Sequence, residues 1–379
     1  MSIRVEVHDS PETFRSLRKG WERIVEEQKL HLFSGDAWHR AWWNAFGGTS
    51  KLLIYSGYQD GHLIGVWPFC LKRSSVKNFY STILETLSGA SADYCLPAVK
   101  TGFEEVFIEK VLSDILKRTG RNIILQFPHL PSGHPASSAI ANLINEKNIR
   151  ADCKTSVCPM LEFGPDYGSV EKAWKKSLRT DLRRQRRRLE EKGELRLHIP
   201  GRKKEILEIL PVFFEMHTAQ WETRKFNMKF LDPEMRQFCR NLADELHENQ
   251  LHFSYLTCGT EVISMHLGFL SSGWLLWYMP AYNMAFERQS PGKVHLHMLI
   301  EHGLGKGWKG IDFLQGNEEY KLMWSTTSVE TNSYTCSKAW SLQYSWLITI
   351  KPWFLYNFGG LYRQLKPARQ MAGYVDIAH

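Results

Sequence analysis

Segments that favour strands and segments that favour helices alternate along most of the sequence, and the same order occurs twice. Each half contains helices, an antiparallel hairpin of β-rich runs, a further helix, and then a strand that follows a Gly or Asn turn. Strands that alternate with helices exclude an all-α or an all-β protein. We therefore expect an α/β fold with mixed (α+β) sheets, arranged as two similar domains in tandem.

The length of the chain fits this expectation, because 379 residues with 43% hydrophobic side chains can form two packed domains of ordinary size. The order of segments predicts one domain over residues 1–165 and another over 166–340. A tail over 341–379 is rich in aromatic and basic residues. Such a tail is either an interfacial segment or a terminal strand and helix that pack over the core, and we prefer the second.

Positive charge is concentrated in one predicted helix. Residues 171–193 contain ten Lys and Arg against four Asp and Glu, in a chain whose net charge is +8. One apolar stripe runs along this helix, formed by Trp174, Leu178, Leu182 and Leu189. The other faces are basic and include Arg183, Arg184 and Arg187. They are either solvated or a surface for phosphate groups on a lipid-linked sugar, tRNA or an anionic membrane.

Several classes of protein are not expected. The N-terminal stretch "MSIRVEVHDSPETF" lacks the apolar core of a signal peptide, and no apolar run reaches the ~18 residues of a membrane span. Seven scattered cysteines are typical of reduced thiols, and none lies in a zinc-binding pattern. Hydrolase motifs such as G-x-S-x-G and H-E-x-x-H are absent from the sequence. We expect a cytoplasmic protein without a metal, with peripheral attachment to the inner face of the membrane as a second possibility.

The stretch "ERQSPGKVHLHMLIEHG" predicts a helix that starts in an unusual way. Ser290 at the N-cap and Pro291 at the first helical position are ordinary start signals. Lys293 in the first turn is less ordinary, because the positive end of the helix dipole disfavours a cation. An anion bound between the lysine and the helix start would remove the conflict.

The same turn can offer backbone donors to such an anion. Pro291 has no N–H, but Gly292 and Lys293 do, and Gly292 allows close approach to the backbone. Arg288 is a possible second cation. This pattern indicates a phosphate-binding turn, and the alternative is a capped surface helix with a solvated lysine.

Downstream residues extend this turn into a longer motif. It comprises Ser290-Pro291-Gly292, Gly310, Asp312-Phe313, Gly316-Asn317-Glu318, Tyr320-Lys321 and Trp324. In this pattern the chain resembles the GNAT superfamily of acyl-CoA transferases. More narrowly, it resembles the CelD-like branch, which is associated with polysaccharide biosynthesis and related to the tandem-domain Fem-type aminoacyltransferases. The branch often has Asp where Asn317 stands, but the basic stretch "SLRTDLRRQRRRLEEKGELRL" also fits it, so the resemblance extends to about Ser325.

The resemblance implies acetyl-CoA or another acyl-CoA as co-substrate, with its pyrophosphate at residues 290–293. It also implies that a backbone N–H within residues 274–280 polarises the thioester carbonyl. Tyr320 and Tyr278 are candidates for the general acid that protonates the leaving thiolate.

The general base is open among three residues, which are Glu318, Asp312 and His266. Asp312 has an alternative role in capping a loop, and His266 has one as a packed core histidine. Lys321 and Trp324 would hold the acceptor or the adenine, or simply pack.

The corresponding helix of the first half begins differently. It starts within "KTGFEEVF", where Glu104 and Glu105 occupy the first turn. Two carboxylates stabilise a helix start but repel a pyrophosphate. If the halves are related, only the second should bind coenzyme A, and the first would be a scaffold or would bind the acceptor.

Three functions remain open from the sequence. The leading one is an acyl-CoA-dependent N- or O-acyltransferase, with acetyl as the expected group. Its acceptor would be a sugar, a polysaccharide precursor, a lipid-linked sugar or another small molecule. The second is Fem-type aminoacyl transfer, in which tRNA would be the donor and the basic helix would bind RNA. The third is a non-catalytic protein that binds nucleic acid or an anionic surface on the same scaffold.

Overall fold

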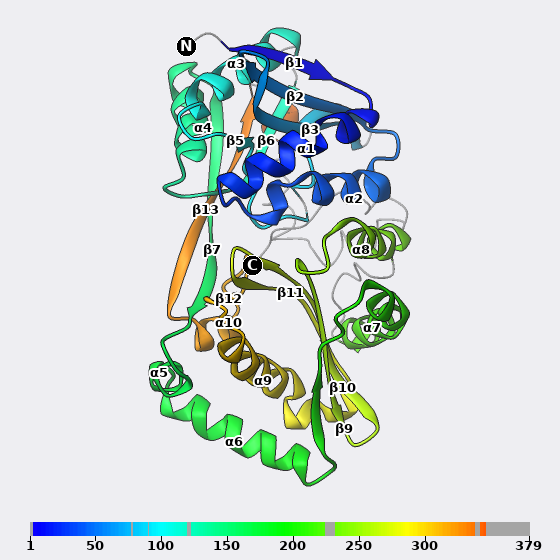
Figure 1. The fold of residues 1–379 in the computed structure, drawn as a ribbon. Helices are drawn as coiled ribbons and strands as arrows, with labels where there is room; N and C mark the ends of the chain where they lie inside the picture. The colour runs from blue at the N-terminus through cyan, green and yellow to red at the C-terminus, as the bar shows by residue number, and fades with distance from the viewer. Residues whose placement is uncertain are drawn as a thin grey trace. The chain divides into compact units, whose positions relative to one another are not determined.

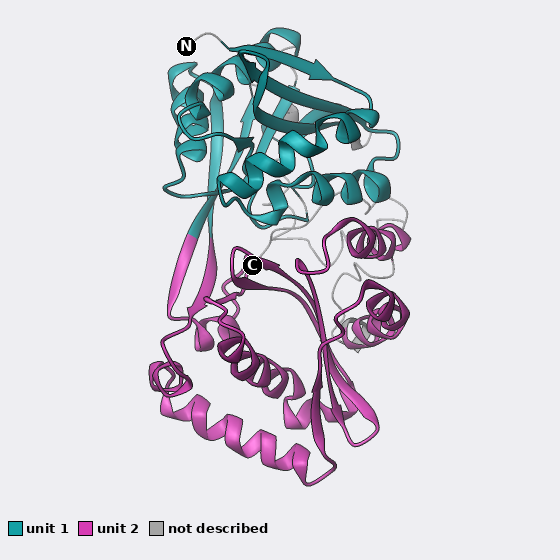
Figure 2. Ribbon diagram, viewed as in Figure 1, with its two compact units in different colours: residues 1–156, 330–379 teal, residues 157–329 magenta. Residues whose placement is uncertain are grey.

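The structure is a computed structural model that describes residues 3–76, 79–89, 91–119, 123–223, 232–337 and 342–345 (Figure 1). The chain divides into two compact units, which are unit 1 (residues 1–156 and 330–379) and unit 2 (residues 157–329) (Figure 2). The tail predicted over 341–379 falls outside the described residues, apart from the short helix α11 (Leu342–Ser345).

Unit 1 is a mixed sheet with helices on both faces (Figure 1). Its elements are β1 (Arg4–His8), α1 (Glu12–Glu27), η1 (Leu32–Ser34), α2 (Asp36–Phe46), β2 (Lys51–Gln59), β3 (His62–Val76), β4 (Phe79–Thr86), β5 (Ala98–Val99), α3 (Glu104–Arg118), β6 (Ile123–Pro131), α4 (Pro135–Glu146), β7 (Arg150–Glu162) and β13 (Thr327–Ser337). The strand order is β1-β2-β3-β4-β6-β13-β7, and β5 pairs with β3. Strands β4 and β6 are parallel, whereas β1–β2, β2–β3, β3–β4 and β6–β13 are antiparallel.

Unit 2 repeats this plan. Its elements are α5 (Tyr167–Ala173), α6 (Lys176–Glu190), β8 (Leu195–His198), α7 (Lys203–Thr223), α8 (Pro233–Glu245), β9 (Leu251–Cys258), β10 (Glu261–Ser271), β11 (Trp274–Tyr282), η3 (Met284–Gln289), α9 (Pro291–Gly305), β12 (Gly310–Asp312) and α10 (Glu319–Trp324). The strand order is β7-β12-β11-β10-β9-β8, with β11 and β12 parallel. Helix α9 covers one face of these strands and α7 the other (Figure 1).

The predicted mixed α/β fold is confirmed. In each unit one helix connects the two parallel strands, α3 between β4 and β6 and α9 between β11 and β12. The compact units do not follow the expected boundaries at residues 165 and 340. Strand β7 carries the chain from unit 1 into unit 2, and β13, which was not expected as a strand, carries it back beside β6.

The apolar stripe of the basic helix is confirmed for Leu178, Leu182 and Leu189, whereas Trp174 lies between α5 (Tyr167–Ala173) and α6 (Lys176–Glu190), where the expected helix is interrupted. Trp174, Leu178, Leu182 and Leu189 are buried, and the first three pack in one cluster with residues of α9, β11 and β12. The stripe therefore fixes α6 against the body of unit 2 and leaves its basic faces outward. All seven cysteines are free thiols. Among the described residues, no helix is both long and apolar enough to cross a bilayer.

Candidate functional site

Strand β11 carries a β-bulge where its parallel neighbour ends. Strands β11 and β12 pair only from Trp274–Gly310 to Leu276–Asp312, and β11 then continues to Tyr282. On its other side, Leu276 opposes Phe269 and Met279 opposes Leu267, so two residues of β11 face the single residue Gly268. A bulge leaves backbone groups unpaired and is common beside active sites. The open edge at residues 277–279 lies within the segment expected to polarise a carbonyl.

Helix α9 begins where the sequence predicts, with Ser290 at the N-cap and Pro291 in the first turn. The Ser290 side chain does not cap the helix, contrary to the usual role of serine there, and its φ of 48° is left-handed. Its carbonyl instead accepts the N–H of Lys293 at 3.0 Å. A Cβ at Gly292 would meet nothing within 4 Å, so the backbone at this position is open to an approaching group.

Lys293 has a partner within the protein. Its Nζ lies 3.0 Å from Oδ2 of Asp181 on α6, and Arg184 donates to Oδ1 of the same carboxylate at 2.5 Å. Partial burial raises the pKa of Asp181, but the hydrogen bonds from Lys293 and Arg184 outweigh this and lower it overall. The sequence left Lys293 either beside a bound anion or solvated, and in the structure the ionised Asp181 balances its charge.

A surface depression of about 400 Å³ adjoins this ion pair. It is lined by one face of α6, through Lys176, Ser177, Thr180, Asp181 and Arg184. Lys293 and Arg184 pair with the Asp181 carboxylate, and Lys176 lines the same depression, so three cations accompany one carboxylate and leave an excess of positive charge. This excess favours a polyanionic ligand.

Asp181 was not expected as a site residue from the sequence. A signal for Asp181 was present, because it is the only carboxylate between Lys175 and Leu189. A single acid in a basic helix indicates a specific cationic partner, although the sequence does not say which one.

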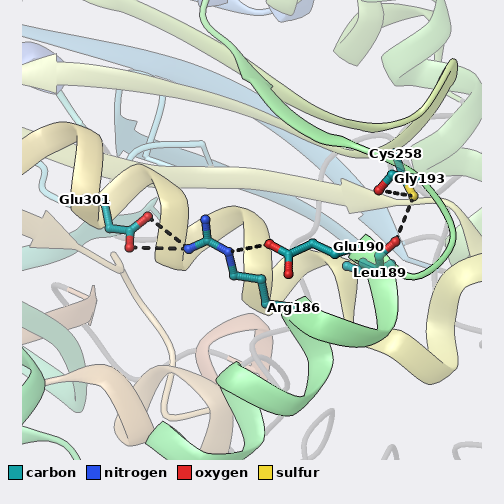
Figure 3. Close-up of polar contacts among 6 residues, drawn as sticks. All are labelled: Arg186, Leu189, Glu190, Gly193, Cys258 and Glu301. Carbon is teal, nitrogen blue, oxygen red and sulfur yellow. Dashed lines mark hydrogen bonds and ion pairs between the residues drawn. The ribbon is translucent and has the colours of Figure 1, made fainter.

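Most of the other arginines of α6 are paired. Arg183 lies 2.7 Å from Glu171 and Arg187 lies 3.6 Å from Glu191. Arg186 bridges Glu190 on its own helix and Glu301 on α9 (Figure 3). These pairs hold the helix in place and offset much of its charge. Arg183 and Arg187 nevertheless remain 74% exposed, so both can still reach an anion in solvent.

The motif that follows β12 forms a compact clasp. Nζ of Lys321 lies 3.0 Å from the carboxylate of Glu318 and donates to the carbonyl of Gln315. A Cβ at Gly316 would overlap the Glu318 carboxylate and lie 2.8 Å from Nζ of Lys321, so the pair requires glycine at this position. Lys321 is buried, whereas the Glu318 side chain is 54% exposed. Glu318 is therefore the accessible member of the pair.

The two candidate tyrosines have different surroundings. Tyr320 is 37% exposed, and desolvation of its phenol, with a further contribution from the Glu318 carboxylate, raises its pKa above the usual value. The side chain of Trp277, in the bulge, lowers this pKa in part. Tyr278 instead packs against Phe269, with ring centroids 5.2 Å apart.

Three predicted site residues lie in the core. The Asp312 carboxylate accepts the N–H of Leu314 at 2.8 Å and is 1% exposed, which is the loop-capping role. Trp324 is fully buried edge-to-face on Trp174, so the predicted contact with a substrate is not possible for it here. His266 is also fully buried, as expected of a packed core histidine. Arg288 is exposed on η3.

The described residues contain no group of three or more His, Cys, Asp or Glu side chains that could hold a metal ion. The candidate site comprises backbone amides at the bulge and at the start of α9, cations around the depression, and Tyr320 with Glu318. Amides and cations stabilise developing negative charge, and a protonated phenol can neutralise a leaving anion.

The sequence pattern of the Acetyltransferase (GNAT) domain matches residues 176–322, which contain α6, the bulge, the start of α9 and the clasp. No curated protein matches the chain. Residues 176–322 are therefore similar to a GNAT-type acetyltransferase domain, and the enzyme class that this match supports is that of an acyltransferase.

Three solved structures share the fold. The crystal structure of FemX has a TM-score of 0.59 at 11% identity and covers 92% of this chain and 100% of its own. The C-terminal domain of a proposed lysylphosphatidylglycerol synthetase from Agrobacterium fabrum has a TM-score of 0.53 at 10% identity, covering 90% and 97%. A conserved protein of unknown function from Bacteroides thetaiotaomicron has a TM-score of 0.51 at 11% identity, covering 88% and 100%. At these identities the likeness concerns the fold alone.

Proposed function

We propose that the protein transfers a short acyl group, such as acetyl, from acyl-CoA to a nitrogen or oxygen of a sugar, polysaccharide precursor or other small acceptor. The observation that supports this most directly is the open bulge of β11 in the same unit as the uncovered start of α9 and the cation-rich depression of α6. The choice of a sugar acceptor follows from the resemblance to the CelD-like branch.

In this proposal the ligand pyrophosphate binds at the start of α9. The N–H of Gly292 donates to it, and Lys293, Lys176 and Arg184 supply positive charge. A helix N-terminus and surrounding cations favour the same ligand for independent reasons. Arg288, which is exposed on η3, is placed to contribute a further cation.

The transfer step uses the edge of β11 and the residues of the clasp. The acceptor attacks the thioester carbonyl while the backbone N–H groups at 277–279 stabilise the oxyanion. The carbon–sulfur bond then breaks, and Tyr320 donates its proton to the thiolate. Glu318 is the base that takes the proton of the acceptor. A tyrosine phenol is protonated at neutral pH, and the raised pKa of Tyr320 keeps it so over a wider range of pH.

The first experiment is calorimetric titration with acetyl-CoA at two salt concentrations. We expect the wild type to bind and Lys293→Glu to lose about 100-fold in affinity, since one charge-assisted contact, worth roughly 1.5–3 kcal/mol, becomes a repulsion. Lys306→Glu, which makes the same change of charge at the other end of α9, is the matched control and should bind as the wild type does. No binding of acetyl-CoA by the wild type would refute the proposal.

A second candidate function is aminoacyl transfer from tRNA. It is favoured by the fold of FemX, which matches nearly the whole chain, and by the exposed cations Arg183 and Arg187. It predicts strongly salt-dependent binding of aminoacyl-tRNA that Arg183→Glu and Arg187→Glu together weaken, with no binding of acetyl-CoA. Calorimetry with the two donors separates the candidates.

A further inference from the structure

The bulge of β11 places a large aromatic side chain directly after the last residue that pairs with β12. Trp277 follows Leu276, whose partner Asp312 is the last residue of β12. The indole of Trp277 is 4% exposed and belongs to the same core cluster as Leu275, Ile311 and Phe313. The indole therefore packs in the core beside the point where the two parallel strands stop pairing.

A histidine holds this indole in place. The ring of His266 on β10 stacks on Trp277 with centroids 3.9 Å apart and an angle of 14° between the planes. His266 is fully buried, and neither of its ring nitrogens has a hydrogen-bond partner among the residues that the structure describes. Packing rather than hydrogen bonding therefore determines where this ring lies. Burial lowers the pKa of His266 far below its usual value, so the stacked ring is neutral.

Gly268 makes room for the stack. It is the residue that opposes the bulge, and a Cβ at this position would overlap the His266 ring and come within 2.5 Å of the Leu276 carbonyl. Any other residue here would displace either the histidine or the bulge. Gly268, His266 and Trp277 thus pack together at the bulge, and a larger residue at position 268 would disturb the stack.

We infer that Trp277, braced by His266, limits the length of the acyl group, so that acetyl and similarly short groups fit and longer chains do not. This inference rests on the proposed function, because it places the thioester carbonyl at the open edge of residues 277–279. An acyl chain that extends inward from that edge meets the indole. Protein interiors are packed densely, so a longer chain enters only if the indole moves off His266.

The test compares the binding of acetyl-, butyryl- and hexanoyl-CoA by calorimetry. We expect the wild type to bind acetyl-CoA at least tenfold more tightly than hexanoyl-CoA. Trp277→Ala should reverse the preference, with butyryl-CoA about tenfold tighter than acetyl-CoA, since each buried methylene adds roughly a factor of four. His266→Ala should shift the preference in the same direction by a smaller factor, because Trp277 loses its brace.

Leu275→Ala is the matched control. Leu275 is buried in the same cluster and on the same strand, but it lies within the part of β11 that pairs with β12. It should keep the preference for acetyl-CoA even if the variant is less stable. Trp277→Phe provides a second, milder variant, with an expected shift between those of the wild type and the alanine variant.

The possible failures can be told apart. If the wild type binds all three thioesters equally well, or if Trp277→Ala folds and keeps the preference for acetyl-CoA, the inference about Trp277 is wrong and the proposed function stands. If the wild type binds none of the three, the proposed function itself is wrong, and the inference is lost with it.

Discussion

Helices α3 and α9 occupy equivalent places in the two units, but their first turns have opposite chemistry. At the start of α3, the carboxylate of Glu104 accepts the N–H of Gly102 at 2.7 Å, and Glu104 is nearly buried. At the start of α9, the backbone at Gly292 faces open space and Lys293 stands beside it. The start of α3 thus contains the carboxylate of Glu104, whereas the backbone at the start of α9 has room for an anion from outside the protein.

The openings between the parallel strands differ in the same way. In unit 1, strand β6 continues past the end of its pairing with β4, and the chain itself lies along it. Cys95 donates its N–H to the carbonyl of His129 at 3.0 Å, and the His129 ring lies 2.9 Å from the carbonyl of Ala92. In unit 2 no described segment pairs with β11 beyond Leu276 on the β12 side. The comparison indicates that a shared fold does not by itself make a binding site, and that local residues decide which copy has one.

The largest effect is expected when the carboxylate of α3 is copied onto α9. Gly292→Asp adds a side chain where there is space and should not harm folding, because a carboxylate suits a helix N-terminus. It should weaken binding of acetyl-CoA by about 100-fold, since it repels the phosphates and also pairs with Lys293. Calorimetry measures the loss.

Gly292→Asn is the matched control, with the same shape and no charge. It should lose much less affinity than the aspartate. If Gly292→Asp binds acetyl-CoA as tightly as the wild type does, the start of α9 is not the phosphate site and the contrast between the two helices has no functional meaning.

Acid should destabilise both units alike, because each contains a buried neutral histidine. The two units should therefore differ in ligand binding but not in this pH dependence of stability. Burial lowers the pKa of His39 in unit 1 to about 3, partly opposed by a hydrogen bond to the backbone of Leu87. Burial, and secondarily His252, lowers the pKa of His295 in unit 2 to about 3. The unfolded chain then binds more protons below about pH 6.5, so stability is present above that pH and is lost as the pH falls towards 3.

A change from pH 7 to pH 5 should lower the free energy of unfolding by about 2 kcal/mol for each of these histidines. The loss is roughly 1.4 kcal/mol per pH unit below 6.5. Urea unfolding at the two pH values checks this. His39→Asn and His295→Asn should each remove a similar part of the pH dependence. A pH dependence that both variants retain in full would show that other groups cause it.

A smaller effect is expected when the anion of α3 is removed. Glu104→Ala should lower the free energy of unfolding by about 1 kcal/mol, because the N–H of Gly102 loses its acceptor. Glu104→Gln, which keeps an oxygen acceptor, should lose less. Neither variant should bring a second acetyl-CoA site to unit 1, since the chain near Cys95 still lies along β6. A binding stoichiometry of two in calorimetry would contradict the comparison.

These contrasts show what could be predicted from the sequence. Local rules identify the start of α9 at Ser290, the apolar stripe of α6 that contains Leu178, and the carboxylate of Glu104, because each depends on neighbouring residues. The pair of Lys293 with Asp181 joins two helices far apart in the sequence and depends on how they pack. No local pattern gives it.

Strand β13 was missed for a related reason. Its sequence, "TSVETNSYTCS", is polar and only partly buried, so it lacks the alternation that marks a strand with one apolar face. Its pairing with β6 supplies what its own residues do not. The hydroxyl of Ser333 on β13 accepts the N–H of His129 on β6, which lies 204 residues away along the chain. The same applies to the start of β7 at Arg150, whose first residues are mostly exposed.

The smallest predicted effect concerns Asp181, the carboxylate of α6 that pairs with Lys293 of α9. Asp181 holds Lys293 in the absence of a ligand, so a phosphate must compete with it for the ammonium group. Asp181→Asn should therefore bind acetyl-CoA about three- to tenfold more tightly at low salt, with the gain shrinking at high salt as charges are screened. Glu171→Gln, which removes the carboxylate partner of Arg183, is the matched control and should change affinity much less. If Asp181→Asn binds more weakly than the wild type, the carboxylate orients Lys293 rather than competing with the ligand, and α9 then resembles α3 in depending on a resident anion.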